Sequence, residues 1–159
     1  MKIIKEIKQD EVWKHWKNVE GWVDDNFRSD IRDKLPDNLQ WYISILETFD
    51  IGKTFIISSN DWRDNDRLCI PDFKLLTAMS NYQVSLNTTS KYGDIRKKEL
   101  VLKNNLMGID TKLFLIAPMQ TGPFTIIEGN RRAIALGNLG KLNKLEIFLG
   151  VSSQIKKCV

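Results

Sequence analysis

The chemical groups that stand out in this chain lie together in the segment Glu128-Gly129-Asn130-Arg131-Arg132, between an apolar run and a helix-forming stretch. Glycine lets the backbone approach a ligand closely, and the unpaired N–H groups at a helix start attract anions. Guanidinium groups present planar forks that suit phosphate oxygens. Two arginines near a helix N-terminus oppose its dipole by about 0.3–1 kcal/mol per charge, and a bound anion would reverse that sign. The segment therefore predicts a site for a phosphate-bearing ligand.

Other interpretations of these residues stay open at this level. Glu128 could hold a metal, act as a general base, or pair with one of the arginines. Both arginines could also pair with nearby carboxylates in solvent and bind no ligand. Successive helical residues point about 100° apart, so the two guanidinium groups are not expected to face one small ligand equally.

The elements that would position this segment follow from apolar periodicity and from turn residues. Residues 124–127 predict a strand, Glu128-Gly129-Asn130 a tight turn, residues 131–139 a helix closed by Gly140, and residues 145–149 a second strand. Further upstream, the patterns predict strands and helices in the following ranges: strands at 54–58 and 112–117, a helix opening at Pro71 and Asp72, and a helix from Asp94 to Met107.

The first fifty residues predict mostly helix. Asp10 can cap a helix to about Glu20, and Asp37 can cap another, because apolar residues recur after it at spacings of three and four. The chain is thus expected to be one α+β domain over residues 1–159. It would have an N-terminal helical part (1–50) and a core with a small mixed sheet (53–151). The N-terminal helices are expected to pack on that sheet through Leu39, Ile43 and Leu46.

The stretch Phe124–Leu136, with the sequence FTIIEGNRRAIAL, resembles the core motif of the ParB/sulfiredoxin-like superfamily. In that motif a strand leads into an acidic residue, a glycine, a variable residue and a basic pair, followed by a helix containing alanine, here Ala135. The resemblance covers about residues 94–151. It implies a compact α+β fold with a phosphate-cradling loop that binds ATP or CTP, with Mg²⁺ as a candidate companion.

The resemblance carries over residue by residue, with departures. It implies Glu128 as the catalytic residue and Gly129, Asn130, Arg131 and Arg132 as phosphate-binding residues. Arg132 is expected to face the ligand while Arg131 pairs with Glu128. A second ligand-facing segment adds Arg63. Sulfiredoxins carry their catalytic cysteine where Asn130 stands, and partition proteins carry a further arginine where Ile134 stands.

These departures argue against sulfinic acid reduction and against a CTP clamp on DNA, for which the chain also lacks a helix-turn-helix domain. The function expected is nucleotide or phosphate binding, with nucleotide hydrolysis, phosphate transfer or nuclease activity open. The alternative is a non-enzymatic nucleic-acid-binding or regulatory module that uses the same basic loop.

Composition bears on the expected partners, location and metal content of the protein. The net charge of +4 permits a polyanionic partner without requiring one. No signal-peptide pattern or membrane-length apolar run is present, so a cytoplasmic protein without a membrane partner is expected. His15 is the one histidine of the chain and offers neither a metal pair nor a triad by sequence, so it is expected to be a surface or core residue. No metal site is predicted, and the oligomeric state is left open.

Overall fold

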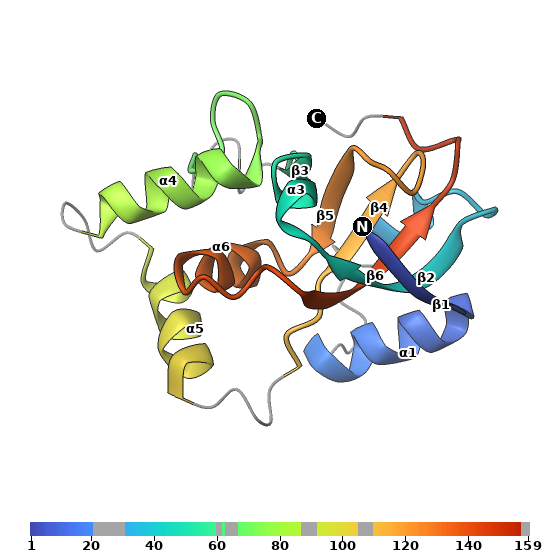
Figure 1. Cartoon of the computed structure of the whole chain (residues 1–159), viewed down its shortest axis with the longest axis horizontal. Coiled ribbons are helices and arrows are strands. Elements are labelled where there is room, and N and C mark those ends of the chain that lie inside the picture. Colours follow the sequence, from blue (N-terminus) through green and yellow to red (C-terminus); the bar gives the residue numbers. More distant parts are fainter. Residues whose placement is uncertain (21–30, 60–61, 63–66, 87–91, 105–109, 157–159) are drawn as a thin grey trace.

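In this computed structural model, the residues described are 1–20, 31–59, 62, 67–86, 92–104 and 110–156. They form an α+β fold around a six-stranded mixed sheet with the order β1-β2-β6-β4-β5-β3 (Figure 1). The strands are β1 (Lys2–Ile7), β2 (Gln40–Leu46), β3 (Thr54–Ile56), β4 (Phe114–Ala117), β5 (Phe124–Glu128) and β6 (Leu145–Val151). The helices are α1 (Gln9–Glu20), α3 (Thr48–Ile51), α4 (Leu75–Ser85), α5 (Gly93–Asn104) and α6 (Asn130–Asn138).

The expected strand–turn–helix–strand unit is confirmed as β5, α6 and β6. β5 pairs with β3 in parallel and with β4 antiparallel, and β4 pairs in parallel with β6. All four strands expected between residues 54 and 149 are therefore present in one sheet. The helices expected near residues 10–20, 72–79, 94–107 and 131–139 are also present as α1, α4, α5 and α6. The expected end of the third of these, at Met107, lies outside the described residues.

The expectation for residues 1–50 was wrong in part, because this region contributes two strands as well as α1. The segment expected to be a helix after Asp37 is strand β2, which pairs antiparallel with β1 and over its whole length with β6. Its residues QWYISIL include aromatic and β-branched side chains that favour strands, and their spacing also matches a helical stripe. The segment is a strand because it pairs with β6 along its whole length. Leu39, Ile43 and Leu46 consequently belong to the sheet layer and do not form a helix face.

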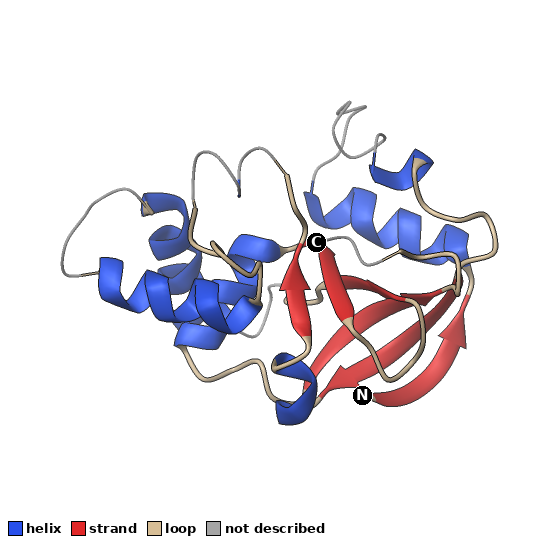
Figure 2. Ribbon diagram, turned by 90° about the horizontal axis from the view of Figure 1, so that it is seen from above, coloured by secondary structure: helices blue, strands red, loops and turns tan. Residues whose placement is uncertain are grey.

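Helices cover both faces of the sheet, as the view along its edge shows (Figure 2). Side chains of β4 and of the residue before it alternate between the two layers: Leu113 and Leu115 are buried toward α4, α5 and α6, while Phe114 and Ile116 are buried toward α1. On the α1 side, Trp16 stacks on Phe114 with ring centroids 5.1 Å apart. Because both faces are covered, the central strand β4 is apolar and buried along its whole length, with the sequence FLIA.

A partly buried polar network joins the three helices on the other face. The hydroxyl of Tyr82 in α4 donates to Glu99 Oε2 in α5 at 2.9 Å, and Asn138 Nδ2 in α6 donates to Glu99 Oε1 at 2.8 Å. One carboxylate therefore ties α4 and α6 to α5. Burial and the hydrogen bond to Glu99 together raise the pKa of Tyr82 from 10.0 to about 12.

This raised pKa predicts a loss of stability at high pH. In the unfolded chain a tyrosine ionises near its ordinary value, whereas folded Tyr82 holds its proton up to about pH 12. The stability contributed by neutral Tyr82 is thus fully present below about pH 10 and is lost as pH rises through the folded pKa. Denaturant unfolding at about pH 9 and about pH 11 should reveal this loss in the wild type. Tyr82→Phe should reduce the difference, whereas Tyr42→Phe, whose hydroxyl is exposed, should not. Identical pH dependence in all three proteins would contradict the assignment.

Candidate functional site

The motif lies at the end of the sheet where β5 finishes and β4 begins. Glu128, the last residue of β5, is the register partner of Phe114, the first residue of β4. Gly129 follows with φ of 92°, a left-handed conformation that reverses the chain and serves as the N-cap of α6. An added Cβ at Gly129 would lie 2.8 Å from the Leu113 Cδ2 atom, so the turn presses closely against the sheet. Only glycine combines this φ with this close approach.

The two polar residues beside Gly129 are partly buried. Glu128 Oε1 accepts a hydrogen bond from the Gly129 N–H at 2.7 Å, so its carboxylate is held against the start of α6, where the helix dipole favours negative charge. The side-chain Oδ1 of Asn130 is buried and accepts no hydrogen bond within the part of the chain that the structure describes. An acceptor in that situation favours a donor from outside the described residues.

Arg131 and Arg132 diverge, as helical geometry requires. The Arg131 guanidinium lies over the ring of Trp62, 5.8 Å from its centroid, which is within cation–π range. Trp62 follows β3, which is the parallel neighbour of β5. Arg132 is buried, with only 7% of its surface exposed, and its Nη1 donates to the Lys112 carbonyl oxygen at 2.6 Å. The hydrogen bond fixes the guanidinium against the segment that leads into β4.

Arg132 also lines a cavity of about 700 Å³ between α1, α5 and the first turn of α6. The lining includes Lys97 and Lys98 from α5, and its one acidic side chain among the described residues is Asp110. Because three cationic side chains and one carboxylate line it, the cavity has a net positive charge. The full described lining is His15, Asn18, Val19, Lys97, Lys98, Val101, Leu102, Asp110 and Arg132.

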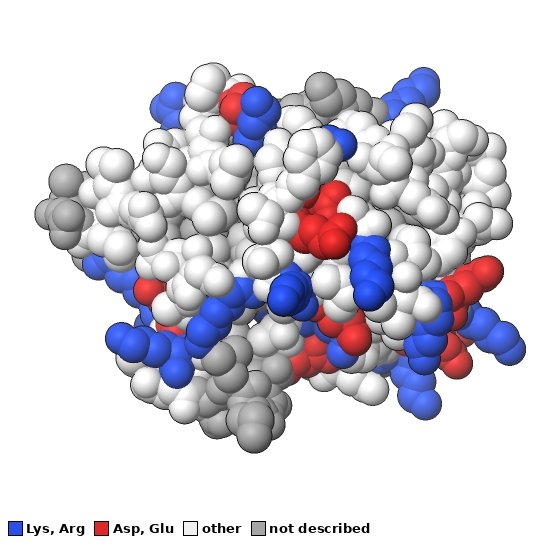
Figure 3. Space-filling view, in the orientation of Figure 1, with Lys and Arg blue, Asp and Glu red and all other residues white. Residues whose placement is uncertain are grey.

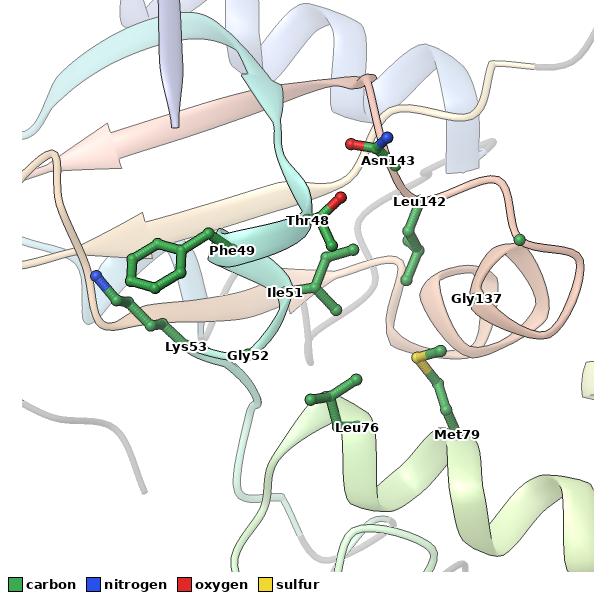
Figure 4. Close-up of a pocket in the computed structure, with 11 residues that line it drawn as sticks. Thr48, Phe49, Ile51, Gly52, Lys53, Leu76, Met79, Gly137, Leu142 and Asn143 are labelled. Carbon is green, nitrogen blue, oxygen red and sulfur yellow. The ribbon is translucent and has the colours of Figure 1, made fainter.

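A second cavity, of about 550 Å³, lies between α3, α4 and the connection that follows α6 (Figure 4). Its walls are mostly apolar, with Ile51, Leu76, Met79 and Leu142 facing it. At its rim the Lys53 ammonium lies 4.2 Å from the centroid of the exposed Phe49 ring. It meets α6 at Gly137, far along the helix from the motif, and among the predicted site residues that the structure describes, none lines it.

The structure thus separates the residues that the sequence grouped together. Arg132 lies in the wall of the positive cavity, Arg131 lies against Trp62, and Glu128 is held at the Gly129 N–H. Arg63 lies outside the described residues. Sequence reasoning did not single out Lys98, Asp110 or His15 as site residues. The doubled lysine at 97–98 was the available signal, whereas nothing local connected His15 with Asp110.

Within the described segments, no helix is long and apolar enough to cross a bilayer. Among the same residues, no group of three or more His, Cys, Asp and Glu side chains is placed to hold a metal ion. Comparison of the chain with protein-family models, with curated proteins and with solved structures finds no match.

Proposed function

We propose that this protein binds a phosphate-bearing ligand, a nucleotide such as ATP or CTP, in the cavity between α1, α5 and the first turn of α6. The observation that carries the proposal is Arg132, a buried guanidinium in the wall of a cavity that also collects Lys97 and Lys98. Arg132 donates to the Lys112 carbonyl, and Lys97 and Lys98 are exposed to solvent. Their gathering around one cavity creates a positive potential there, which favours an anionic ligand such as phosphate.

The size and the position of the cavity support a nucleotide. A volume of about 700 Å³ falls within the range of cavities that hold small-molecule ligands. The site lies where β5 leads through Gly129 into α6, and helix N-termini favour anions. The ParB/sulfiredoxin-like resemblance of residues 124–136 points to ATP or CTP at this junction. In this proposal Arg132 contacts phosphate and Asn130 offers its backbone N–H group. Gly129, whose own N–H is donated to Glu128, shapes the turn, and Arg131 lies beside the junction over Trp62.

A second function has an observation in its favour. Lys and Arg side chains gather over the lower left of the molecule in Figure 3, where Figure 1 places α5. Helix α5 carries the run Arg96-Lys97-Lys98 and then Lys103. Such a cationic helix could contact the phosphate backbone of a nucleic acid without any enzyme activity. Backbone binding weakens steeply with added salt, whereas a nucleotide held in a cavity depends on salt less strongly.

The proposal predicts that the paired substitution Lys97→Ala/Lys98→Ala weakens nucleotide binding. Both side chains are exposed on α5 and line the cavity, so their loss removes two favourable charges without opening the core. We expect affinity for ATP or CTP to fall by about tenfold or more, since a hydrogen bond to a charged group contributes about 1.5–3 kcal/mol. Isothermal titration calorimetry with ATP, CTP and ADP, with and without Mg²⁺, measures this change in affinity.

Lys103→Ala is the matched control, because Lys103 is exposed on the same helix but does not line the cavity. It should leave nucleotide affinity close to that of the wild type. If the wild type binds none of the three nucleotides at millimolar concentration, the proposed function is wrong. If Lys103→Ala weakens binding as much as the paired substitution does, the site is a diffuse cationic surface, and the nucleic-acid alternative gains support.

A further inference from the structure

His15 and Asp110 come together at the wall of the same cavity, although one lies in α1 and the other just before β4. The imidazole Nε2 of His15 lies against Oδ2 of the Asp110 carboxylate. Both side chains line the cavity together with Arg132, and both retain some access to solvent, with 28% and 24% of their surface exposed. A histidine beside a carboxylate is an arrangement that acid–base catalysis often uses.

Both partners are held in place. The His15 ring lies edge-on to Phe148, with ring centroids 4.8 Å apart, and beside Phe114 at 6.2 Å. The second carboxylate oxygen of Asp110, Oδ1, accepts the Lys112 backbone N–H at 2.9 Å. The carboxylate lies against Nε2 without forming a hydrogen bond of good geometry to it, and its negative charge there favours a proton on Nε2 over one on Nδ1. The nitrogen left to exchange a proton with a ligand is Nδ1.

The pair is also coupled to the cationic side of the cavity through one short segment. Lys112 donates its N–H to Asp110 and accepts from Arg132 Nη1 at 2.6 Å on its carbonyl oxygen. The group that orients the histidine and the group that would hold phosphate are therefore anchored on the same residue. Glu128, by contrast, holds the N–H of Gly129 and is not among the described residues that line this cavity.

We infer that His15 and Asp110 form the acid–base pair of a phosphate-cleaving site in this cavity, acting on the terminal phosphate of a nucleoside triphosphate. The inference rests on the proposed function. A water oxygen attacks the terminal phosphorus and forms a new P–O bond while Nδ1 of His15 takes one water proton. The bond to the bridging oxygen breaks, and that oxygen leaves with the bonding electron pair on the nucleoside diphosphate. The imidazolium then returns its proton to solvent.

Each group has a distinct part in this step. Asp110 positions the imidazole and stabilises the imidazolium that forms, without touching the substrate. Arg132, Lys97 and Lys98 stabilise the charge that accumulates on the phosphate oxygens and on the leaving oxygen. The histidine that the sequence assigned to the surface or the core thus acquires a chemical role through its neighbours.

The test compares phosphate release from ATP and CTP, in the presence of Mg²⁺, with binding of their non-hydrolysable methylene-bridged analogues. His15→Gln should lower the rate of phosphate release by about 100-fold or more, the contribution typical of a general base, with analogue affinity nearly unchanged. Asp110→Asn should also lower the rate with little effect on affinity. Added imidazole should restore part of the rate to His15→Ala. A merely structural histidine would show no such recovery. Lys14→Ala, exposed on α1 beside His15, is the control expected to match the wild type.

The outcomes separate the two proposals. A wild type that binds neither nucleotide nor analogue overturns the proposed function, and the acid–base pair with it. A wild type that binds the analogues but releases no phosphate overturns the acid–base pair alone. So does phosphate release that survives His15→Gln unchanged. Loss of analogue binding in His15→Gln, with a melting temperature equal to that of the wild type, would make His15 a binding residue and would also overturn its catalytic assignment.

Discussion

Gly129→Ala should lower the free energy of unfolding by about 2–5 kcal/mol, a large effect for one added methyl group. Two penalties combine at this position. A non-glycine residue in the left-handed region, here at φ of 92°, costs about 1–2 kcal/mol. The new Cβ would also lie 2.8 Å from Cδ2 of Leu113, which is fully buried, and overpacking of a core costs about 1–3 kcal/mol. Chemical denaturation followed by circular dichroism measures the sum.

Gly140→Ala separates these two penalties. Gly140 also has a left-handed backbone, with φ of 68°, but an added Cβ there meets no atom within 4 Å. It should therefore cost only the backbone penalty of about 1–2 kcal/mol. Equal destabilisation by the two substitutions would mean that the Leu113 side chain moves aside at little cost. The contact between the added Cβ and Leu113 would then contribute nothing to the loss of stability. Because Gly129 begins the turn into α6, its substitution should also weaken nucleotide binding, whereas Gly140→Ala should leave binding intact.

Arg132→Ala should destabilise the protein more than Arg131→Ala does, although the sequence assigned the ion pair with Glu128 to Arg131. Arg132 is buried, and its removal leaves the Lys112 carbonyl without the donor now 2.6 Å away. A hydrogen bond to a charged group contributes about 1.5–3 kcal/mol. Arg131 is half-buried over Trp62, and a cation–π contact of that kind contributes about 0.5–1 kcal/mol. Each kcal/mol lowers the melting temperature of a chain of this length by about 2–4 °C.

Binding should follow the same order, because Arg132 is the arginine that lines the positive cavity. Arg132→Lys is the informative companion, since lysine keeps the charge but loses the planar fork that can bind Lys112 and phosphate together. Affinity for ATP should fall in the order wild type, Arg132→Lys, Arg132→Ala, measured well below the melting temperature of each protein. If Arg131→Ala loses more affinity than Arg132→Ala, the ligand lies on the Trp62 side of α6, and the cavity assigned above is not its site.

This position of Arg132 also changes how the motif should be understood. The sequence predicted that Arg132 faces the ligand and that Arg131 pairs with Glu128. In the structure each has its own surroundings, and Arg132 serves the fold and the cavity at once. A test of its function that ignores stability would misattribute part of the loss. For that reason the exposed Lys97 and Lys98 are the cleaner probes of ligand binding.

The sequence by itself determined the local architecture around the motif. Apolar β-branched runs, a glycine at the junction and a closing Gly140 were sufficient to predict β5, the turn, α6 and β6, because each depends on periodicity and turn chemistry within a short window. The α+β class and the mixed sheet followed from the same patterns. The tight turn at Gly129 was predicted as well, and the structure adds that its backbone is left-handed, a conformation that glycine adopts at little cost.

Only the tertiary structure decided which segments became neighbours. Residues 40–46 satisfy helical and strand patterns alike, and it was the full-length pairing with β6 that made them a strand. The contact of His15 with Asp110, and the shared anchor of Asp110 and Arg132 on Lys112, join residues from α1, α6 and the segment before β4. Such contacts depend on how the sheet orders its strands and on which face each helix covers. No local window of sequence contains that information, because it is fixed by packing between elements that are distant along the chain.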